Sequence, residues 1–555
     1  MKRRTRLMAL LLTLVMAATM GACGGTTAPA ATPSATPAAS SVEATPEASP
    51  EATPEPEKKE WTGTITINTQ AGPGAAEAWN GVAAGYMAKN PGVKVVVDLK
   101  PAEGYAEWIQ GMFGNADPTA DIVNINLAGP AAAGKAINFM EYADMESPYS
   151  GGPWTEQFNY EMQTKDLARN EWTSLSLESV QVLWTYNKDI FEEVGVTPPK
   201  TWDEFIAVCD KLLAAGYQPL SMSGDFNSFW AMQMGWLAQI YMDQTTRSML
   251  DVYRAQKGDY NYDPDMDGVF KLDVADPFND DPWKVNQNVV RAFKAVRDGV
   301  YKPDSEGAKT VWTNFAKMFP KYAGGKAFFG TKDSLPLFYQ GKAAIFLDGA
   351  WRLAQFKRDM DLVNSGKEVV SNEKAIEGVK QFRLGTFNMP SMQGPGIEAP
   401  ARTIEVAIGF LGAVSKDKEH NDLVMDFLMY YSSEEGFSQY MAGGLGGGWT
   451  PAGPALVKGV SLPAEYADLF SELDFIGNAQ KGYGQMISRG APGDVQQSLR
   501  DWYGYSQELL EGKITVDQWA AKHKENVMKY LPDALAASKI NASDLDNPQN
   551  APTGK

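Results

Sequence analysis

Three aspartates in one short turn form the first candidate for chemistry in this sequence of 555 residues. Asp263, Asp265 and Asp267 alternate with other residues, and Gly268 follows directly. An EF-hand loop has carboxylates at positions 1, 3 and 5 and glycine at position 6, so this spacing predicts a structural calcium site. The twelfth position holds Val274 where an EF-hand has glutamate. A solvated turn is the alternative, because aspartate, proline and glycine all favour turns.

Residues for other kinds of catalysis are scarce. Of the two histidines, His523 lies on an apolar helical stripe and is predicted to pack there, whereas His420 lies near a predicted helix start and is predicted to be solvated. No histidine-based zinc site or histidine-assisted nucleophile is therefore evident. We predict a loop over the glycine-rich run 443–453, because glycines let the backbone bend as a hinge or approach a ligand closely. The run lacks the Lys-Ser/Thr pair of a phosphate-binding P-loop. The carboxylate pair of a glycoside hydrolase stays an open alternative, since spacing in sequence cannot exclude a pair in space.

The first 22 residues predict a secretory signal peptide. Four Lys and Arg residues precede an apolar stretch, 7–20, that is too short to span a bilayer. Gly21, Ala22 and Cys23 follow in an order that resembles a lipobox, so we predict lipidation of Cys23. Stable anchoring takes more than one acyl chain. The only other cysteine, Cys209, falls on an apolar helical face and is predicted to be buried.

Residues 23–60 predict a lipid-anchored, disordered tether. From residue 24 onward the segment is almost entirely Ala, Thr, Pro, Ser and Glu, with Val42 as its only bulky aliphatic residue. Such a composition cannot bury enough surface to fold, and its prolines stiffen it. We therefore expect the protein at the extracellular face of the cell membrane. A tether of this length favours a bacterium with a single membrane.

Composition and charge limit the classes of partner. About 495 residues follow the tether, enough for two or three domains. With 44% hydrophobic and 21% charged residues, the chain is typical of soluble globular proteins. Without residues 1–22, 46 basic residues stand against 68 acidic ones, a net charge of −22. We expect no nucleic-acid binding, because phosphate contacts need clustered Lys and Arg.

The elements that must position a site begin with alternating strands and helices. We predict strands over 64–69, 93–99 and 121–126, separated by helices over 75–89 and 104–113. This order predicts βα units and a mostly parallel sheet.

Ligands of open α/β sheets bind beyond the carboxyl ends of the strands. This rule places Gln70, Asn124 and Asn126 near a cleft, with a role in turns or helix caps as the alternative for each.

A second α/β unit follows over 182–221. This unit is predicted to contain a buried strand, a short helix capped by Asn187 and ended at Gly195, and a longer helix. Thr201 and Glu204 form a predicted capping box at the start of that longer helix. These features predict only an α/β unit, and packing explains each residue.

The order of residues in this unit carries information beyond the α/β pattern. The run 186–205, YNKDIFEEVGVTPPKTWDEF, closely resembles a segment of family 1 extracellular solute-binding proteins, the sugar-binding receptors of bacterial ABC importers. Further runs resemble the same family in the same order: GNADPTADIV, GKAAIFLDGAW, FRLGTFNMPSM, SSEEGFSQY and GGLGGGWTPAG. The resemblance extends from Ile65 to about Leu531.

The resemblance implies a two-lobed α/β fold like that of periplasmic binding proteins, with mixed sheets flanked by helices. The lobes are discontinuous, joined by three crossings, and close about a hinge. The predicted parts are an N-terminal lobe of 61–175 plus 403–449, a C-terminal lobe of 176–402 plus 450–535 with an insertion at about 244–335, and a frayed tail of 536–555.

The resemblance also implies a ligand site. In the family, the aromatic residue that ends the GKAAIFLDGAW run commonly stacks on the sugar, so Trp351 is the foremost candidate. Asp348 could bind hydroxyls, and Glu178 lies close to where the family often has a polar sugar contact. Trp449 and Trp230 are further stacking candidates, because an indole covers the apolar face of a sugar ring. Core packing is the alternative for each tryptophan.

These features together predict a carbohydrate receptor that binds an oligosaccharide and delivers it to the permease subunits of an ABC transporter. We expect a monomer that is not an enzyme and requires no cofactor. Some larger family members have a structural calcium loop in the C-terminal lobe, which supports the calcium prediction. The alternatives are a secreted glycoside hydrolase and a receptor for a solute other than a sugar.

Overall fold

The computed structural model describes residues 59–115, 118–165, 171–371, 374–471, 473–481 and 486–554. The predicted signal peptide, Cys23 and all but the last residues of the tether lie outside these ranges. The strands are β1 (Gly63–Ile67), β2 (Val93–Val97), β3 (Ile122–Asn124), β4 (Glu178–Asn187), β5 (Gln218–Ser221), β6 (Ala343–Gly349), β7 (Val370–Ser371), β8 (Lys374–Ala375), β9 (Leu384–Phe387), β10 (Glu405–Ile408) and β11 (Leu411–Ala413).

The α-helices are spread over the whole described length. They are α2 (Ala75–Lys89), α3 (Tyr105–Gly114), α4 (Lys188–Val194), α5 (Trp202–Ala214), α6 (Phe226–Ala231), α7 (Gln233–Asp243), α8 (Leu250–Tyr253), α9 (Val289–Arg297), α10 (Glu306–Met318), α11 (Leu335–Tyr339), α12 (Trp351–Asn364), α13 (Lys418–Tyr431), α14 (Glu434–Gly446), α15 (Ala464–Phe470), α16 (Gln496–Leu510), α17 (Val516–Lys529) and α18 (Leu531–Ala537).

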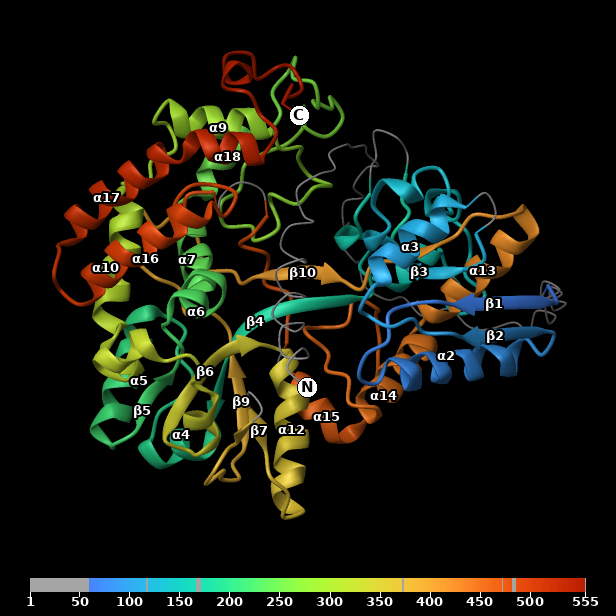
Figure 1. Cartoon of the computed structure of the whole chain (residues 1–555), viewed down its shortest axis with the longest axis horizontal. Helices are drawn as coiled ribbons and strands as arrows, with labels where there is room; N and C mark the ends of the chain where they lie inside the picture. The colour runs from blue at the N-terminus through green and yellow to red at the C-terminus, as the bar shows by residue number, and fades with distance from the viewer. Residues whose placement is uncertain are drawn as a thin grey trace, which may run out of the picture.

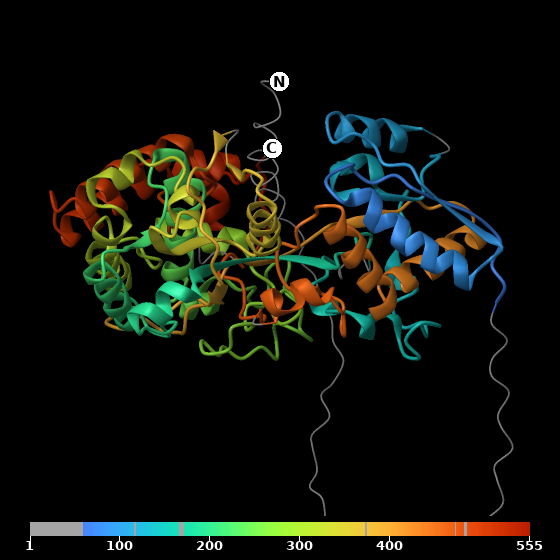
Figure 2. The ribbon, with the colours of Figure 1, turned by 90° about the horizontal axis from the view of Figure 1, so that it is seen from below.

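Two bodies lie side by side, and each is built on its own sheet (Figures 1 and 2). In the smaller body the strand order is β11-β3-β1-β2, with β1 parallel to both β2 and β3 and β11 antiparallel to β3. Helices α2 and α13 pack against this sheet, and α14 packs against both helices, around buried residues such as Ile65, Trp79 and Phe427. The predicted parallel βα units at the start of the chain are confirmed.

The larger body is built on a mixed five-stranded sheet. β10, β4, β6 and β5 follow one another, β9 also pairs with β4, and only the β5–β6 pair is parallel. Every residue of β6 is buried, as in a central strand. The predicted α/β class with mixed sheets flanked by helices is therefore confirmed.

The predicted second α/β unit forms as expected from its local signals. The Asn187 side chain accepts hydrogen bonds from the first turn of α4, and Gly195 ends that helix with φ 69°. Thr201 and Glu204 form the reciprocal capping box of α5. Cys209 lies on the buried face of α5, and burial raises the pKa of its thiol. Local capping chemistry thus fixes both helix starts.

β4 and β10 join the two bodies. The first residues of β4 pair with β10, whereas the later residues pair with β6 and β9 in the larger body. Leu177, just before β4, belongs to the core of the smaller body, and Val182 belongs to the core of the larger one. β11, which follows β10 directly, pairs with β3 in the smaller body.

The boundaries between the bodies differ from those predicted. Residues 403–408 were expected in the N-terminal lobe, but Ile404 packs in the core of the larger body and β10 pairs with β4. The C-terminal lobe was expected to resume at residue 450, yet Val457 and Leu462 still pack on the smaller body. Pairing between distant strands sets these limits, and the local sequence does not carry that information.

The insertion and the tail pack together. Leu250 and Phe293 of the insertion share a buried cluster with Val527, Leu535 and residues beyond them. Part of the predicted insertion, including α10, instead joins the main core of the larger body. The tail was expected to fray, but Leu545 is fully buried in the cluster, and the Asn288 side chain donates to the Pro548 carbonyl at 2.7 Å.

The glycine-rich run was also expected to be a loop, and most of its first half is helical. α14 extends to Gly446 and lies against α2. A Cβ atom on Gly443 would lie 2.4 Å from the Glu77 carbonyl oxygen of α2. The glycines therefore allow two helices to approach closely, and the predicted hinge or ligand contact applies only to residues after Gly446.

Candidate functional site

Trp351 is the first residue of α12, directly after the buried strand β6. Its ring covers Gly349, where a Cβ atom would lie 1.9 Å from a ring carbon. The ring also meets Trp236 edge-on, with centroids 6.2 Å apart and an interplanar angle of 75°. Trp236 is buried and Trp351 is partly exposed. The indole is thus held in a fixed orientation while part of it stays open to solvent.

Asp348 is buried, and its carboxylate is bound within the protein. One oxygen accepts a 2.6 Å hydrogen bond from Arg352 Nε, and the other accepts the Gly349 N–H at 2.9 Å. Asp348 therefore orients Arg352, whose side chain is 26% exposed and also contacts Gln355. Arg352 was not among the predicted ligand residues. Its position four residues after Asp348, at a helix start, is the signal that could have found it.

Gln70 and Asn124 come together at the carboxyl ends of β1 and β3. The Asn124 side-chain oxygen accepts a hydrogen bond from the Gln70 backbone N–H at 2.8 Å, so this oxygen is already used as an acceptor within the fold. Asn126 lies two residues further on in a 3₁₀ turn and is exposed. The structure places all three at the predicted edge of the sheet, and joins the first two directly.

Trp449 and Glu178 are linked through Tyr440, which was not among the predicted ligand residues. The Tyr440 ring meets Trp449 edge-on at 5.8 Å, and its hydroxyl donates to Glu178 Oε1 at 3.2 Å. Trp449 is partly exposed and its backbone lies against Gly74, before α2. Desolvation raises the pKa of Glu178 to about 7, although the hydrogen bond from Tyr440 acts in the opposite direction.

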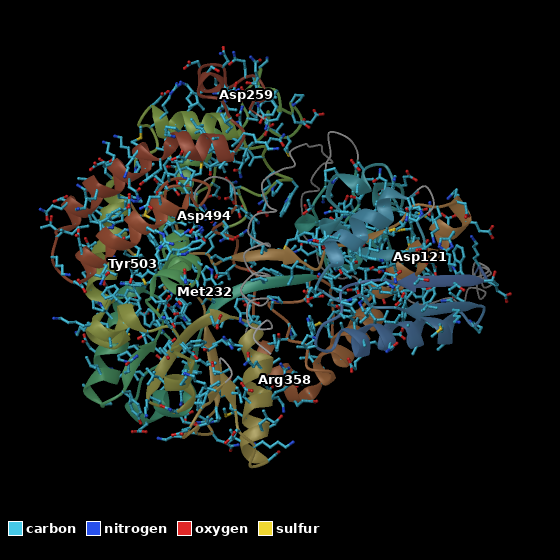
Figure 3. All side chains as sticks on the ribbon, in the orientation of Figure 1. Asp121, Met232, Asp259, Arg358, Asp494 and Tyr503 are labelled. Carbon is cyan, nitrogen blue, oxygen red and sulfur yellow. The ribbon has the colours of Figure 1, made fainter. Side chains whose placement is uncertain are left out.

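Helix α12 connects the two groups. Arg358 Nη1 donates to the Trp449 backbone carbonyl at 3.1 Å, across the junction of the two bodies (Figure 3). Arg358 lies seven residues after Trp351, a rise of about 10 Å along the helix axis. Ala354 of the same helix packs with Leu445 of α14. A single rigid helix therefore carries one tryptophan and contacts the other.

Trp230 has a different set of neighbours. Its ring lies 6.4 Å from that of Phe226, and the Arg489 guanidinium lies 5.9 Å from its centroid. Its backbone carbonyl accepts from Arg489 Nη1 at 2.8 Å. Trp230 is partly exposed. Arg489 has no signal in the local sequence, because it comes from a segment more than 250 residues away.

The aspartate turn is held by its own hydrogen bonds. Asp267 is buried, and its carboxylate accepts the backbone N–H groups of Asp263 and Asn286 together with the Asn286 side chain. The Asp265 N–H donates to the Asp263 carboxylate. Within the described ranges, no three His, Cys, Asp or Glu side chains are grouped to hold a metal ion. In this conformation the loop is a turn closed by its own hydrogen bonds, and calcium binding stays a prediction.

Both histidines serve the fold. His523 is buried between the Tyr505 hydroxyl and the Ile487 carbonyl, and desolvation lowers its pKa to about 4. This agrees with the predicted packing role. His420 was expected to be solvated, but its Nε2 lies 2.7 Å from the buried Asp121 carboxylate.

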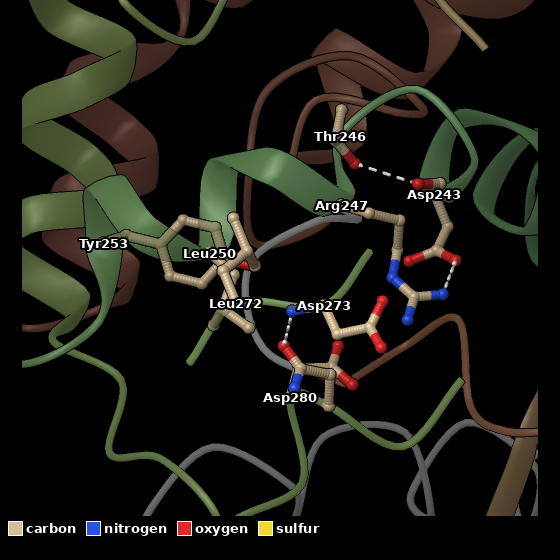
Figure 4. A pocket seen from close by; sticks show the side chains of 9 residues that line it. Asp243, Thr246, Arg247, Leu250, Tyr253, Leu272, Asp273 and Asp280 are labelled. Atoms are coloured by element: carbon tan, nitrogen blue, oxygen red, sulfur yellow. Dashed lines mark hydrogen bonds and ion pairs between the residues drawn. The ribbon is translucent and has the colours of Figure 1, made fainter. Parts of the chain in front are cut away.

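Two cavities among the described residues lie away from the predicted ligand residues. One of about 10 Å³, lined by Asp243, Arg247, Asp280 and others, holds about one water molecule and is too small for a sugar (Figure 4). An open polar groove of about 480 Å³ runs between α10 and the start of α17. Neither is lined by a predicted ligand residue.

None of the helices in the described part of the chain combines the length and apolar character needed to cross a membrane. The family description "Bacterial extracellular solute-binding protein" matches residues 72–436. The chain belongs to this family. Its family is one of binding proteins that act outside the cytoplasm.

A curated relative of this solute-binding protein is the "Probable sugar-binding periplasmic protein" of Mesorhizobium japonicum. The two are 30% identical over 113 residues, or 20% of this chain and 25% of the relative. The matched part thus spans about a quarter of the relative's length.

Two solved structures are similar over most of their length. A family 1 extracellular solute-binding protein from Bifidobacterium longum subsp. infantis is 15% identical, with 84% of this chain and 98% of that chain covered and a TM-score of 0.48. The cyclic α-maltosyl-1,6-maltose binding protein of Arthrobacter globiformis is 14% identical, with 85% and 100% covered and a TM-score of 0.48.

The chemistry available in this solute-binding protein is recognition of a polar ring with an apolar face. Trp351 and Trp449 offer flat apolar surfaces from the two bodies. Arg352 follows Trp351 in α12, and Glu178 is joined to Trp449 through Tyr440, so each indole has an ionisable hydrogen-bonding group close to it in the structure. Within this set, the described contacts include no histidine or cysteine nucleophile.

Proposed function

We propose that this protein captures an oligosaccharide outside the cell and passes it to the permease subunits of an ABC transporter. The observation that carries the proposal is the pair of partly exposed tryptophans on the two bodies, joined through α12. Trp351 begins this helix, and Arg358 of the same helix binds the Trp449 carbonyl. A ligand held between such groups would contact both bodies only when they are close together.

The choice of a sugar follows from the groups beside the indoles. A sugar ring has an apolar C–H face, which an indole covers, and hydroxyls that need planar polar partners. Arg352 and Glu178 are such partners. The name of the relative from Mesorhizobium japonicum, a probable sugar-binding periplasmic protein, supports the same ligand class.

Ligand capture would use the two strands that join the bodies. A ligand that binds the closed arrangement more tightly shifts the population toward it. β4 and β10 are paired to each other at the junction, so the bodies can rotate while these strands stay connected. In this proposal Cys23 carries the lipid anchor and residues 23–60 form the tether, so the closed protein meets the permease at the membrane.

The test is a thermal shift assay of the purified protein with mono- and oligosaccharides, followed by recovery of the sugar. A ligand at about 100 times its Kd stabilises the folded state by about 2.7 kcal/mol, which raises Tm by a few degrees. We expect one class of oligosaccharide to do this and to be recovered intact. Trp351→Ala should abolish the shift.

Trp61→Ala is the matched control, because Trp61 lies before the amino end of β1, opposite the edge that holds Gln70. This variant should keep the full shift. A cleaved sugar would favour the glycoside hydrolase, and a shift given only by a solute of another class would replace the sugar in the proposal.

A further inference from the structure

Arg489 forms a set of contacts around Trp230 that the proposed site does not explain. Its Nη1 donates to the Trp230 backbone carbonyl at 2.8 Å, and its guanidinium lies 5.9 Å from the centre of the Trp230 ring. Its Nη2 donates to Asp494 Oδ1 at 2.7 Å. Arg489 is only 7% exposed, so the charge is almost fully withdrawn from water. One guanidinium thus fixes both the backbone and the ring of Trp230.

The backbone on both sides is shaped for these contacts. α6 and α7 are interrupted at Met232, with φ −130° and ψ −127°, so the path of a continuous helix is broken just after Trp230. Asp494, which is labelled in Figure 3, has φ 51°, a left-handed conformation that few residues other than glycine, asparagine and aspartate adopt readily. The Asp494 carboxylate is therefore placed at some conformational cost, which the ion pair with Arg489 offsets.

Trp230 and Trp351 flank the start of α7. A Cβ atom on Gly235 would lie 2.0 Å from the Trp230 carbonyl oxygen and 3.3 Å from Arg489 Cδ, so the absence of a side chain there lets these groups pack. The next residue, Trp236, contacts the Trp351 ring. The two partly exposed tryptophans are therefore connected through adjacent residues of one helix.

We propose that Arg489 is a positioning residue that holds Trp230 as a second stacking surface, for a neutral sugar unit beyond the one at Trp351. This inference rests on the sugar-binding function proposed above. Arginine presents a planar group that suits stacking on an indole and hydrogen bonding at the same time. Because Asp494 balances the charge of Arg489, this ion pair offers no net positive charge to an anionic sugar.

The first measurement is the ¹⁹F NMR spectrum of protein labelled with 5-fluorotryptophan. The Trp230 signal is assigned with Trp230→Phe. In Arg489→Gln we expect the Trp230 signal to move from its wild-type chemical shift, while the Trp351 signal stays in place. In Arg489→Lys the Trp230 signal should lie closer to its wild-type position. Asp494→Asn tolerates the left-handed conformation and should move the Trp230 signal only slightly. An unchanged Trp230 signal in Arg489→Gln would overturn the positioning role, whether or not any sugar binds.

The second measurement is the affinity for maltotriose, xylotriose and raffinose, each compared with its constituent monosaccharides, and for trigalacturonic acid. We expect Arg489→Gln to lower the affinity for the trisaccharide about tenfold, a typical value for one aromatic contact, and to leave the affinity for monosaccharides unchanged. A purely structural role would lower both equally or neither. Arg489→Lys should recover part of the loss.

The outcomes separate this inference from the proposed function. If the wild-type protein binds no saccharide, the proposed function fails, and the stacking role of Trp230 fails with it. The ¹⁹F signal still tests whether Arg489 positions Trp230. If a trisaccharide binds and Arg489→Gln leaves its affinity unchanged, only the stacking role is overturned. Preference of the wild type for trigalacturonic acid would overturn the choice of a neutral ligand.

Discussion

Glu178 is a carboxyl group whose surroundings oppose ionisation at the junction of the two bodies. It opens β4 opposite Ile408 of β10 and accepts a hydrogen bond from Tyr440. Desolvation dominates and raises its pKa to about 7, above the ordinary value of 4.5. Near neutral pH it is therefore present in both forms, and its neutral form can donate a hydrogen bond as well as accept one.

This shift has a definite sign in the pH dependence of stability. The folded state holds the Glu178 proton more tightly than the unfolded state, so the free energy of unfolding falls as pH rises from 4.5 to 7. The change amounts to at most about 3 kcal/mol, since one pKa unit is worth about 1.4 kcal/mol. Glu178→Gln should remove this fall, as measured by urea unfolding at several pH values.

The difference between wild type and variant isolates Glu178 from other groups that titrate in this range. His523, with a pKa lowered to about 4, acts with the opposite sign in both proteins. Tyr440→Phe removes the hydrogen bond that favours the ionised form, so it should enlarge the fall. Identical pH profiles for wild type and Glu178→Gln would refute the argument.

At the scale of elements, the close approach of α2 and α14 fixes the core of the smaller body. Gly443 faces the α2 backbone, and a Cβ atom there would lie 2.4 Å from the Glu77 carbonyl oxygen. Gly446, at the end of the same helix, has no atom within 4 Å of the corresponding position. The same residue type thus has a packing role at one position and none at the other.

Alanine substitutions at the two positions should have opposite effects. Gly443→Ala forces the helices apart and should destabilise the protein by about 1–3 kcal/mol, the usual cost of overpacking. Gly446→Ala fills open space and limits the unfolded chain, so it should stabilise by about 0.5–1 kcal/mol. Chemical denaturation of both variants measures the difference. Equal effects would mean that the two helices do not pack as closely as described.

The elements also show which features can be predicted from sequence. α4 and α5 begin and end at residues whose side chains act on their immediate neighbours, and both were predicted with their caps. The glycine-rich run was interpreted as a loop. Its glycines allow close packing on the α2 backbone, and α2 lies more than 350 residues earlier in the sequence. The same holds for Arg489 and Tyr440, which reach the site from distant segments. Trp351 could be proposed because it lies within a recognisable run.

For the whole molecule, Arg402 is the residue that ties the parts of the larger body together. It is 1% exposed and lies just before β10, where the chain leaves for the smaller body. Its guanidinium binds the carboxylates of Asp243, at the end of α7, and of Asp280, in the insertion, at 2.6–2.9 Å. It also donates to the Pro277 carbonyl. One side chain thus joins the insertion, the core and the connecting strand.

Replacing Arg402 should therefore loosen the insertion as well as lower stability. Arg402→Met removes the guanidinium that binds two buried carboxylates, and breaking such a buried ion pair typically costs about 3–5 kcal/mol. Arg383→Met is the matched control, because Arg383 also binds two carboxylates, Asp189 and Glu192, but is 60% exposed. Such surface pairs contribute about 0–1 kcal/mol.

Hydrogen exchange locates the effect. In Arg402→Met we expect faster exchange of amides around Asp280 and in β10, and unchanged exchange in β1 and β2 of the smaller body. If the Asp243 and Asp280 charges cause the loss, Arg402→Met combined with Asp243→Asn and Asp280→Asn should recover part of the stability, because neutral amides then replace the two buried carboxylates. A loss of protection spread evenly over both bodies would show that Arg402 supports general stability and does not couple the insertion to the connecting strand.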